Sequence, residues 1–294
     1  MKALSPLLGF GLDAQYADCY PREMHGLCAH YHERLTHISI VGLTNQADAK
    51  QFKNQVALNL PVIHHLWGVG PADPHGPNLD QFSKLNEISE VLGAVWCCED
   101  IGIWSIGPYG IPYFAPPLFE IDVADLVAKR IAKLKELSSV HFLAEVPSCS
   151  FIVGNLSLGE FFNKLVEQSG CRLVLDVSHI FSYGLVSGKS PIEILYSLPV
   201  DAVWEIHIAG GRINSLYPHR YIDSHSDPIL TEVEYLLSES VRACKNLKCV
   251  TYEIGATLTE DMIESEVRRI EQTLMIAEFI PKVSDMLNYR DGIC

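Results

Sequence analysis

Acidic and imidazole side chains recur in this sequence where short apolar runs end. The residues of interest are His65, Asp100, Glu145, Asp176, His179, His207 and Glu253, together with Asp223 and His225, which lie in the long connection after the seventh run. An unpaired charge inside a protein is very costly, so a bound cation would explain carboxylates flanked by residues such as Leu175 and Val177. Mixed imidazole and carboxylate ligands suit iron, zinc or manganese, and they lack the thiolates of a structural zinc site. This set exceeds what one ion uses, which predicts at least two metal ions.

Simpler interpretations compete with a metal centre. A lone histidine at the end of a strand is more often a hydrogen-bonded core residue than a ligand. His64 precedes His65 directly, and side chains alternate along a strand, so we expect His64 to face away from the site. The stretch YIDSHSDPIL (221–230) could be an exposed turn, because Asp, Ser and Pro are turn formers. Asp227, followed by Pro228, is predicted to lie in a turn or at the start of a helix.

The apolar runs themselves predict buried strands. They are rich in Val, Ile, Leu and aromatic residues, as strands covered on both faces should be. Their ranges are 7–12, 37–43, 60–67, 94–100, 140–146, 172–178, 202–210 and 248–255.

Segments between the strands carry apolar residues at helical spacing. The predicted helices are 21–35, 45–58, 80–93, 122–138, 157–170, 191–198, 231–246 and 260–280, with Gly170 as a helix C-cap. Alternating strands and helices predict an α/β fold, a TIM-like (β/α)8 barrel forming a single domain over residues 1–294. In such barrels the chemistry lies at the carboxyl ends of the strands. We expect the stretches 68–78, 107–117 and 211–222 to be long loops over that end.

Composition narrows the class of protein. The formal net charge of −14 disfavours a nucleic-acid partner and an acidic membrane surface. No apolar stretch approaches about 18 residues, so we expect no membrane span and no secretion. Nine cysteines with no zinc-type CxxC pair indicate free thiols in a reducing cytoplasm.

The order of these motifs resembles a known family, the multinuclear non-heme iron-dependent oxidative enzymes. This family was formerly known only as bacterial proteins of unknown function, and it includes the methanobactin-biosynthesis oxidase. The likeness rests on the segments LLGFGLDAQY, PVIHHLW, CCEDIGIW, FLAEVPS, LVLDVSHIF, EIHIAGG, YIDSHSDPI and YEIG, in family order.

The resemblance implies a TIM-like barrel that holds two or three iron ions and activates O₂. It implies a cysteine-containing precursor peptide, or a small thiol, as substrate, and a partner protein that presents the peptide. The ligands that it implies are His65, Glu145, Asp176, His207, Asp223, His225 and Glu253.

Two positions depart from the family pattern. Asp100 stands where a histidine is usual, and His179 stands where an asparagine is usual. Both residue types can still bind a metal, so both stay in the predicted ligand set. The second strand, HISIVG, offers no acid where the family tends to carry a glutamate.

Two other functions remain open from the residues alone. One is a redox-inert metal-dependent hydrolase or isomerase on the same barrel. The other is a non-catalytic barrel that binds a peptide. For the oxidase that the resemblance implies, aromatic residues in the predicted loops are candidate substrate contacts: Tyr109, Tyr113, Phe114, Tyr217 and Tyr221.

Overall fold

The computed structural model describes residues 7–279 apart from 16–20, 58 and 256, and these residues form a closed parallel barrel. Around the barrel the strands run in the order β1, β12, β9, β8, β7, β4, β3 and β2. The strands are β1 (Phe10–Gln15), β2 (His37–Val41), β3 (Val62–His65), β4 (Trp96–Asp100), β7 (His141–Glu145), β8 (Arg172–Asp176), β9 (Val203–Ala209) and β12 (Cys249–Ile254). The predicted (β/α)8 barrel is confirmed.

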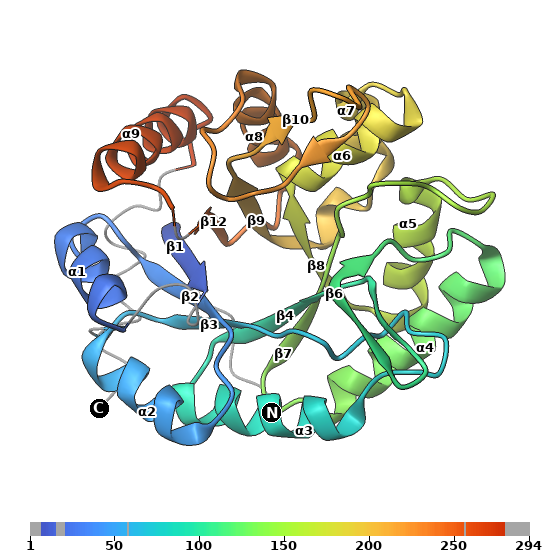
Figure 1. The fold of residues 1–294 in the computed structure, drawn as a ribbon, viewed down its shortest axis with the longest axis horizontal. Helices are drawn as coiled ribbons and strands as arrows, with labels where there is room; N and C mark the ends of the chain where they lie inside the picture. Colours follow the sequence, from blue (N-terminus) through green and yellow to red (C-terminus); the bar gives the residue numbers. More distant parts are fainter. Residues whose placement is uncertain (1–6, 16–20, 58, 256, 280–294) are drawn as a thin grey trace.

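Helices surround the barrel as an outer ring (Figure 1). They are α1 (Pro21–Tyr31), α2 (Gln46–Gln55), α3 (Leu79–Leu92), α4 (Ile121–Leu137), α5 (Leu158–Ser169), α6 (Val177–Ser187), α7 (Pro191–Ser197), α8 (Thr231–Ala243) and α9 (Glu260–Ile276). Ser157 and Glu160 form a reciprocal capping box at the start of α5. Gly170 ends that helix in the left-handed conformation, as predicted.

Alternation along each strand decides which side chains face the site. In β9, Ile206 and Ile208 belong to the core between strands and helices, so Glu205 and His207 face the barrel interior. A smaller cluster fills that interior, and it includes Ile63, Trp96, Leu143 and Val174. The fold therefore presents inward side chains from the strand ends to a common space above this packed layer.

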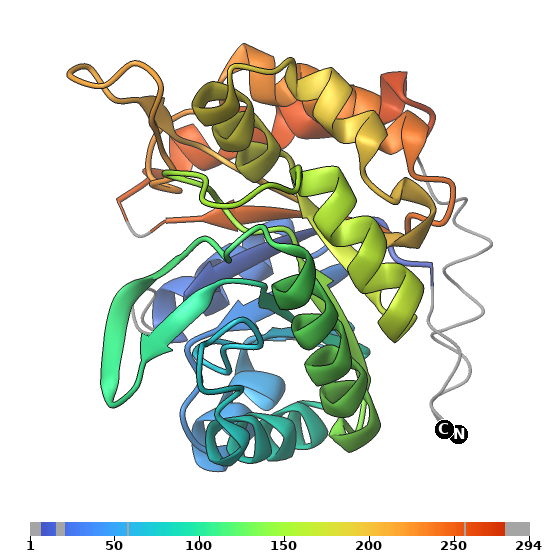
Figure 2. The same ribbon diagram turned by 90° about the vertical axis from the view of Figure 1, so that its right-hand side faces the viewer.

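Two short antiparallel ribbons project from the end of the barrel where the strands finish (Figure 2). Strands β5 (Ile103–Ile106) and β6 (Tyr109–Ala115) form the first, and β10 (Arg212–Ile213) with β11 (Tyr221–Ile222) form the second. The sequence predicts loops over 107–117 and 211–222, but both stretches contain paired strands. The stretch 68–78 is free of helix and strand, as expected.

Two element predictions need correction. Helix α6 is absent from the predicted helices, and it begins at Val177, directly after β8 ends at Asp176. His179 therefore lies on the first turn of a helix and not at a strand end. The first strand is predicted at 7–12, but β1 extends from Phe10 to Gln15, which brings Asp13 into the barrel. Part of the predicted last helix, and the predicted domain's two ends, lie outside the described residues.

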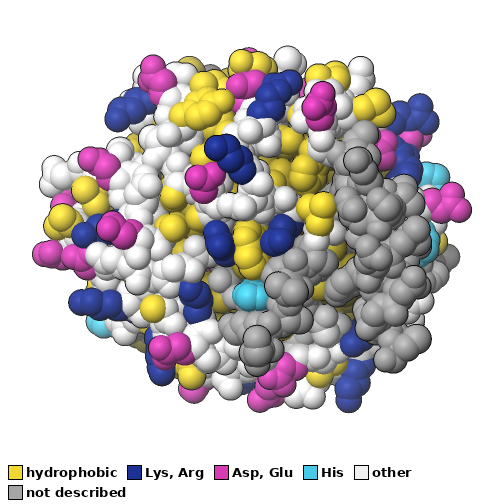
Figure 3. Space-filling view, turned by 180° about the vertical axis from the view of Figure 1, so that it is seen from behind, with side chains coloured by type: hydrophobic (Ala, Val, Ile, Leu, Met, Phe, Trp, Pro, Cys, Tyr) yellow, Lys and Arg dark blue, Asp and Glu magenta, His cyan; other side chains and the backbone are white. Residues whose placement is uncertain are grey.

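The face behind the barrel, opposite the ribbons, carries lysine and arginine mixed with acidic and apolar side chains (Figure 3). At this end Arg172 and Lys248 both lie over the ring of Trp204, at 5.4 and 5.0 Å from its centroid. These cations therefore stand at the strand starts, away from the carboxylates at the strand ends. None of the described helices is long and apolar enough to cross a membrane.

Candidate metal centre

The structure brings all nine predicted ligand residues together at the carboxyl end of the barrel. Strands β3, β4, β7, β9 and β12 supply His65, Asp100, Glu145, His207 and Glu253. Asp176 ends β8, His179 follows on α6, and Asp223 and His225 come from the connection after β11. Asp13 of β1 joins them, although the sequence pattern does not predict it. Whether these residues bind metal stays a prediction, and their geometry can be compared with what a metal would need.

His65 lies in the middle of the carboxylates. Its Nε2 atom is 3.2 Å from Glu145 and 3.7 Å from Asp100. Its Nδ1 atom is 3.5 Å from Asp13 and 3.7 Å from Glu253. Both ring nitrogens thus face oxygen atoms, so a cation on either side of the ring would find a mixed nitrogen and oxygen ligand set.

His207 contacts two of the same carboxylates from inside the barrel wall. Its Nδ1 atom lies 3.2 Å from Glu145 and 3.3 Å from Glu253. All three residues are at least nine-tenths buried. With His65, Glu145 and His207 form one group of three residues whose ligand atoms lie close enough together to hold a metal ion.

A second part of the cluster is organised by the start of α6. Asp176 caps this helix, because one carboxylate oxygen accepts hydrogen bonds from the backbone nitrogens of Ser178 and His179 at 2.6 and 3.0 Å. His179 donates its Nδ1 proton to the Val146 carbonyl at 2.7 Å, which leaves Nε2 facing Asp223 at 2.9 Å. The free oxygen of Asp176 lies 4.0 Å from that same Nε2 atom.

His225 closes the outer side of the cluster. Its Nε2 atom lies 3.5 Å from Asp223 and 3.6 Å from Glu253. Its backbone has a positive φ of 53°, which is uncommon for a residue other than glycine. Two backbone hydrogen bonds fix this conformation, one to Gly210 after β9 and one from Gly255 after β12. The strained turn is thereby attached to two strand ends, which aims the imidazole at the carboxylates.

Burial and mutual charges perturb the ionisable groups in opposite directions. Burial raises the pKa of Asp176 to about 7, and burial together with the charge of Glu145 raises the pKa of Asp100 to about 6. Burial would also raise the pKa of Glu253, but the charges of His207 and His225 lower it to about 2. Similarly, burial opposes the charge on His225, yet Asp223 and Glu253 raise the pKa of its imidazole to about 10.

Several buried oxygen and nitrogen atoms of the cluster have no hydrogen-bond partner among the described residues. They include both oxygens of Asp13 and one oxygen each of Asp100, Glu145, Asp176 and Asp223. Unsatisfied buried carboxylate oxygens are rare and costly. A divalent cation would satisfy them, and these donor types suit iron, zinc or manganese. The residues present therefore fit a multinuclear metal centre.

Three polar residues beside the cluster lie outside it. His64 faces α3. The Ser89 hydroxyl donates its proton to the Leu85 carbonyl at 3.1 Å, so His64 Nδ1 donates to the Ser89 oxygen at 2.7 Å. Glu99 also faces away from the barrel and accepts a hydrogen bond from the Val69 backbone at 3.0 Å. Asp227 accepts from Arg212 and Ser224, as expected of a turn residue. The predicted outward orientation of His64 is confirmed.

A cleft opens above the cluster. His65, Asp100, Glu145 and Glu253 form part of its floor, while Trp104 and Tyr113 of the first ribbon line its wall. Among the residues proposed as aromatic substrate contacts, Tyr113 is the one that lines this cleft. About half of the Tyr113 side chain is exposed, but desolvation of its hydroxyl and the charges of Asp223 and Asp100 raise its pKa well above the usual value, so the hydroxyl stays protonated.

Comparison with known proteins agrees with the sequence motifs. The family model for RiPP precursor modification enzymes MbnB/TglH/ChrH matches residues 33–274. A UPF0276 protein of Acaryochloris marina is 26% identical over 192 residues, covering 64% of this chain and 68% of that protein. A UPF0276 protein of Caulobacter vibrioides is 27% identical over 173 residues, covering 58% of this chain and 60% of that protein. Some of these matches thus span less than two thirds of the relative's length.

Solved structures share the barrel at low sequence identity. The TTHB071 protein from Thermus thermophilus, soaked with ZnCl₂, aligns with a TM-score of 0.60 and 13% identity, covering 90% of this chain and 98% of that chain. A D-psicose 3-epimerase, solved in the presence of D-fructose, aligns with a TM-score of 0.56 and 9% identity, covering 93% of this chain and 99% of that chain. These likenesses establish the fold alone, whereas the family model extends over strands β2 to β12 and the whole predicted ligand set. The chain belongs to the family of RiPP precursor modification enzymes MbnB/TglH/ChrH.

Proposed function

We propose that the protein is a multinuclear non-heme iron oxidase that uses O₂ to modify a cysteine-containing substrate. A ribosomally synthesised precursor peptide fits best with the family, and a partner protein would present it. The observation that carries the proposal is the convergence of six carboxylates and four imidazoles on one buried space, with many of their oxygens unpaired among the described residues. Two or three ions would be needed to satisfy a set of this size.

Iron bound there would supply the activation of O₂ and the coordination of a substrate thiolate. The protein's own residues would fix the geometry. Glu145 and His207 hold their positions through mutual contacts inside the barrel wall, and His179 is oriented by the Val146 carbonyl. Such fixed neighbours keep the ligand atoms in place while coordination positions toward the cleft stay open to substrate.

The cleft wall would orient the substrate. Trp104 has a buried Nε1–H group without a hydrogen-bond partner among the described residues. A peptide carbonyl is a suitable acceptor for it. Tyr113 adds a protonated hydroxyl on the same wall. These two donors would hold the backbone of a peptide while its cysteine side chain reaches the floor of the cleft.

Anaerobic iron loading tests the proposal. We expect at least two iron ions per chain and a Mössbauer spectrum of coupled, high-spin iron. Adding O₂ with a cysteine peptide and the partner protein should consume O₂ and change the peptide mass. Zinc or manganese binding with activity independent of O₂ would contradict it and favour a hydrolase or isomerase, as the epimerase-like fold permits.

A non-catalytic peptide-binding barrel predicts a different result. In that case Asp223→Ala and His225→Ala variants would keep both peptide binding and biological output. The oxidase proposal expects the same variants to lose iron and peptide modification, because both residues face the shared carboxylates.

A further inference from the structure

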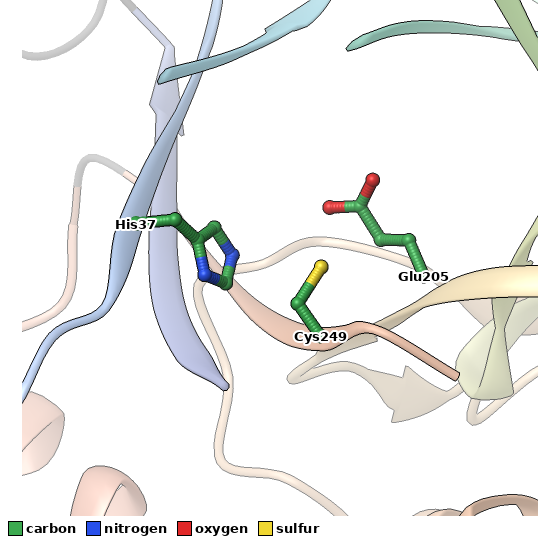
Figure 4. Close-up of side chains that lie close together, drawn as sticks. All are labelled: His37, Glu205 and Cys249. Atoms are coloured by element: carbon green, nitrogen blue, oxygen red, sulfur yellow. The ribbon is translucent and has the colours of Figure 1, made fainter. Parts of the chain in front are cut away.

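A second polar layer lies inside the barrel, below the predicted metal ligands. His37 of β2, Glu205 of β9 and Cys249 of β12 point into the same interior space from three strands (Figure 4). All three are fully buried. Branched apolar side chains usually fill this layer of a TIM barrel, so an ionisable group here calls for a reason.

Space for His37 is built into the fold. Gly11 of β1 pairs with His37 in the parallel register, and a Cβ atom at Gly11 would lie 2.3 Å from the imidazole Nε2. Any side chain at that position would displace the ring. The absence of a side chain at Gly11 of β1 therefore leaves the space that the His37 imidazole of β2 occupies.

The hydrogen bonds of this layer have a defined direction. Thr251 donates its hydroxyl proton to Glu205 at 2.6 Å. Since that proton is used, the 2.9 Å contact between Thr251 and His37 Nε2 requires the imidazole to donate. The other oxygen of Glu205 accepts from Trp96 Nε1 at 2.7 Å. Trp96 and Thr251 thus hold the carboxylate directly, and His37 supports it through Thr251.

This direction of donation distinguishes two uses of the layer. His37, Glu205 and Cys249 lie close enough for their donor atoms to hold an ion. However, the Nε2 atom of His37 carries a proton in this series of hydrogen bonds, so it has no lone pair free to bind an ion. Above this layer, Glu205 Oε1 is 3.1 Å from His207 Nε2, a buried nitrogen that makes no aligned hydrogen bond with any described residue, so Glu205 is an acceptor within reach of its proton.

We propose that Glu205 is a positioning residue for the metal centre, acting through His207. Glu205 would accept the Nε2 proton of His207 and so direct the Nδ1 lone pair toward a cation shared with Glu145 and Glu253. Metal-binding histidines commonly donate their second nitrogen to a carboxylate in this way, which fixes the ring and strengthens the ligand. The inference rests on the proposed metal centre.

The test replaces Glu205 by glutamine, which keeps the shape and removes the charge. We expect the Glu205→Gln variant to bind Co²⁺ about 10- to 100-fold more weakly than the wild type, with altered visible absorption bands from the cobalt ion. Thermal unfolding of both metal-free proteins reports whether the variant is folded. A Thr251→Val variant, which removes one support of Glu205, should show a smaller loss in the same assay.

Cys249→Ala is the matched control, because Cys249 lies in the same layer, whereas Trp96 and Thr251 are the residues that donate hydrogen bonds to Glu205. We expect it to bind cobalt with wild-type affinity and stoichiometry. Unchanged cobalt affinity and spectrum in a folded Glu205→Gln variant would overturn the positioning role. One fewer cobalt ion in Cys249→Ala would also overturn it, since the layer would then be an ion site itself. A wild type that binds no metal would instead refute the proposed metal centre.

Discussion

Glu145 lies among three imidazoles at the centre of the cluster. His65 and His207 are each 3.2 Å away, and His179 is 4.0 Å away. Burial would raise the pKa of Glu145, but the charges of His207 and His65 lower it well below its usual value. It is therefore ionised, central and nearly inaccessible to water, and it would be a ligand of a metal ion bound in the cluster.

Replacing this carboxylate should remove bound metal. We expect Glu145→Gln to lose at least one ion per chain, measured by metal analysis after anaerobic loading. Glu99→Gln is the control, because Glu99 lies near the end of the neighbouring strand but faces away from the cluster. Burial and the charge of Asp100 raise the pKa of Glu99 to about 8, so it is already neutral at pH 7. Equal metal content in the two variants would argue against Glu145 as a ligand.

His64 gives a pH-dependent contribution to stability. Burial lowers its pKa to about 3, from its usual value of 6.5. Between these values the unfolded chain binds a proton at this residue and the folded chain does not. The free energy of unfolding should therefore fall as the pH drops below 6.5, by about 1.4 kcal/mol per pH unit from this residue.

The variant His64→Asn isolates this contribution. An asparagine side chain can place its amide near the Nδ1 position and keep a hydrogen bond to Ser89. Urea unfolding of the metal-free proteins between pH 6.5 and 5 should show a shallower pH dependence for the variant. Parallel curves for the two proteins would mean that His64 is protonated equally in both states.

At the level of elements, Asp73 attaches the first ribbon to the barrel. One of its carboxylate oxygens accepts hydrogen bonds from the backbones of Trp104 and Ser105, at 2.6 and 3.2 Å. The other accepts from the Ser105 hydroxyl at 2.5 Å. Asp73 itself is almost fully buried. Arg130 of α4 donates to the Asp73 carbonyl, so the ribbon, its anchor and the helix ring form one connected unit.

Removing that anchor should loosen the cleft wall without emptying the metal centre. We expect Asp73→Ala to destabilise the fold by about 1–3 kcal/mol, because three donors lose their acceptor. Hydrogen exchange should become faster over residues 103–115, while metal content stays at the wild-type level. Asp73→Asn keeps one acceptor oxygen and should recover part of the protection. Unchanged exchange in Asp73→Ala would show that other contacts hold the ribbon.

The elements also show what sequence patterns can and cannot predict. The eight barrel strands are predictable because fully buried strands carry largely apolar runs. Helix α6 escapes prediction because residues 177–184 are all buried. The segment therefore has no solvent-exposed face, and its apolar residues continue the run that begins in β8. Asp13 escapes because the predicted strand ends one residue before it. The observed strand lies further toward the chain's C-terminus, which places Asp13 in register with Glu253.

The ligand positions are predictable to the extent that they end strands. His65, Glu145, His207 and Glu253 need only the barrel and the alternation rule. The orientations of the Asp223 and His225 side chains depend on the connection after β11. The positive φ of His225 and its backbone hydrogen bonds cannot be read from the sequence. The position of Glu205 is predictable from the sequence. It lies two residues before His207 on the same strand, so both side chains point to the same face of that strand.

For the molecule as a whole, the formal charge of −14 includes the buried carboxylates of the cluster. Those among Asp13, Asp100, Glu145, Asp176, Asp223 and Glu253 that are ionised repel one another, and four imidazoles lie among them. Folding brings these like charges together at one end of the barrel, and the described strand ends offer no lysine or arginine. Divalent cations would relieve that repulsion in the folded chain alone, so metal binding and folding should be coupled.

Thermal unfolding measures this coupling. With free metal at about a hundredfold excess over its dissociation constant, one site adds about 2.7 kcal/mol to the free energy of unfolding. For a chain of this size such a gain raises the melting temperature by roughly 5–10 °C. A chelator should reverse the shift, and the Glu145→Gln variant should show a smaller shift because part of its ligand set is gone. Metal that shifts wild type and variant equally would bind elsewhere, for instance at exposed acidic side chains, and the cluster at the barrel mouth would then need another explanation for its unpaired carboxylates.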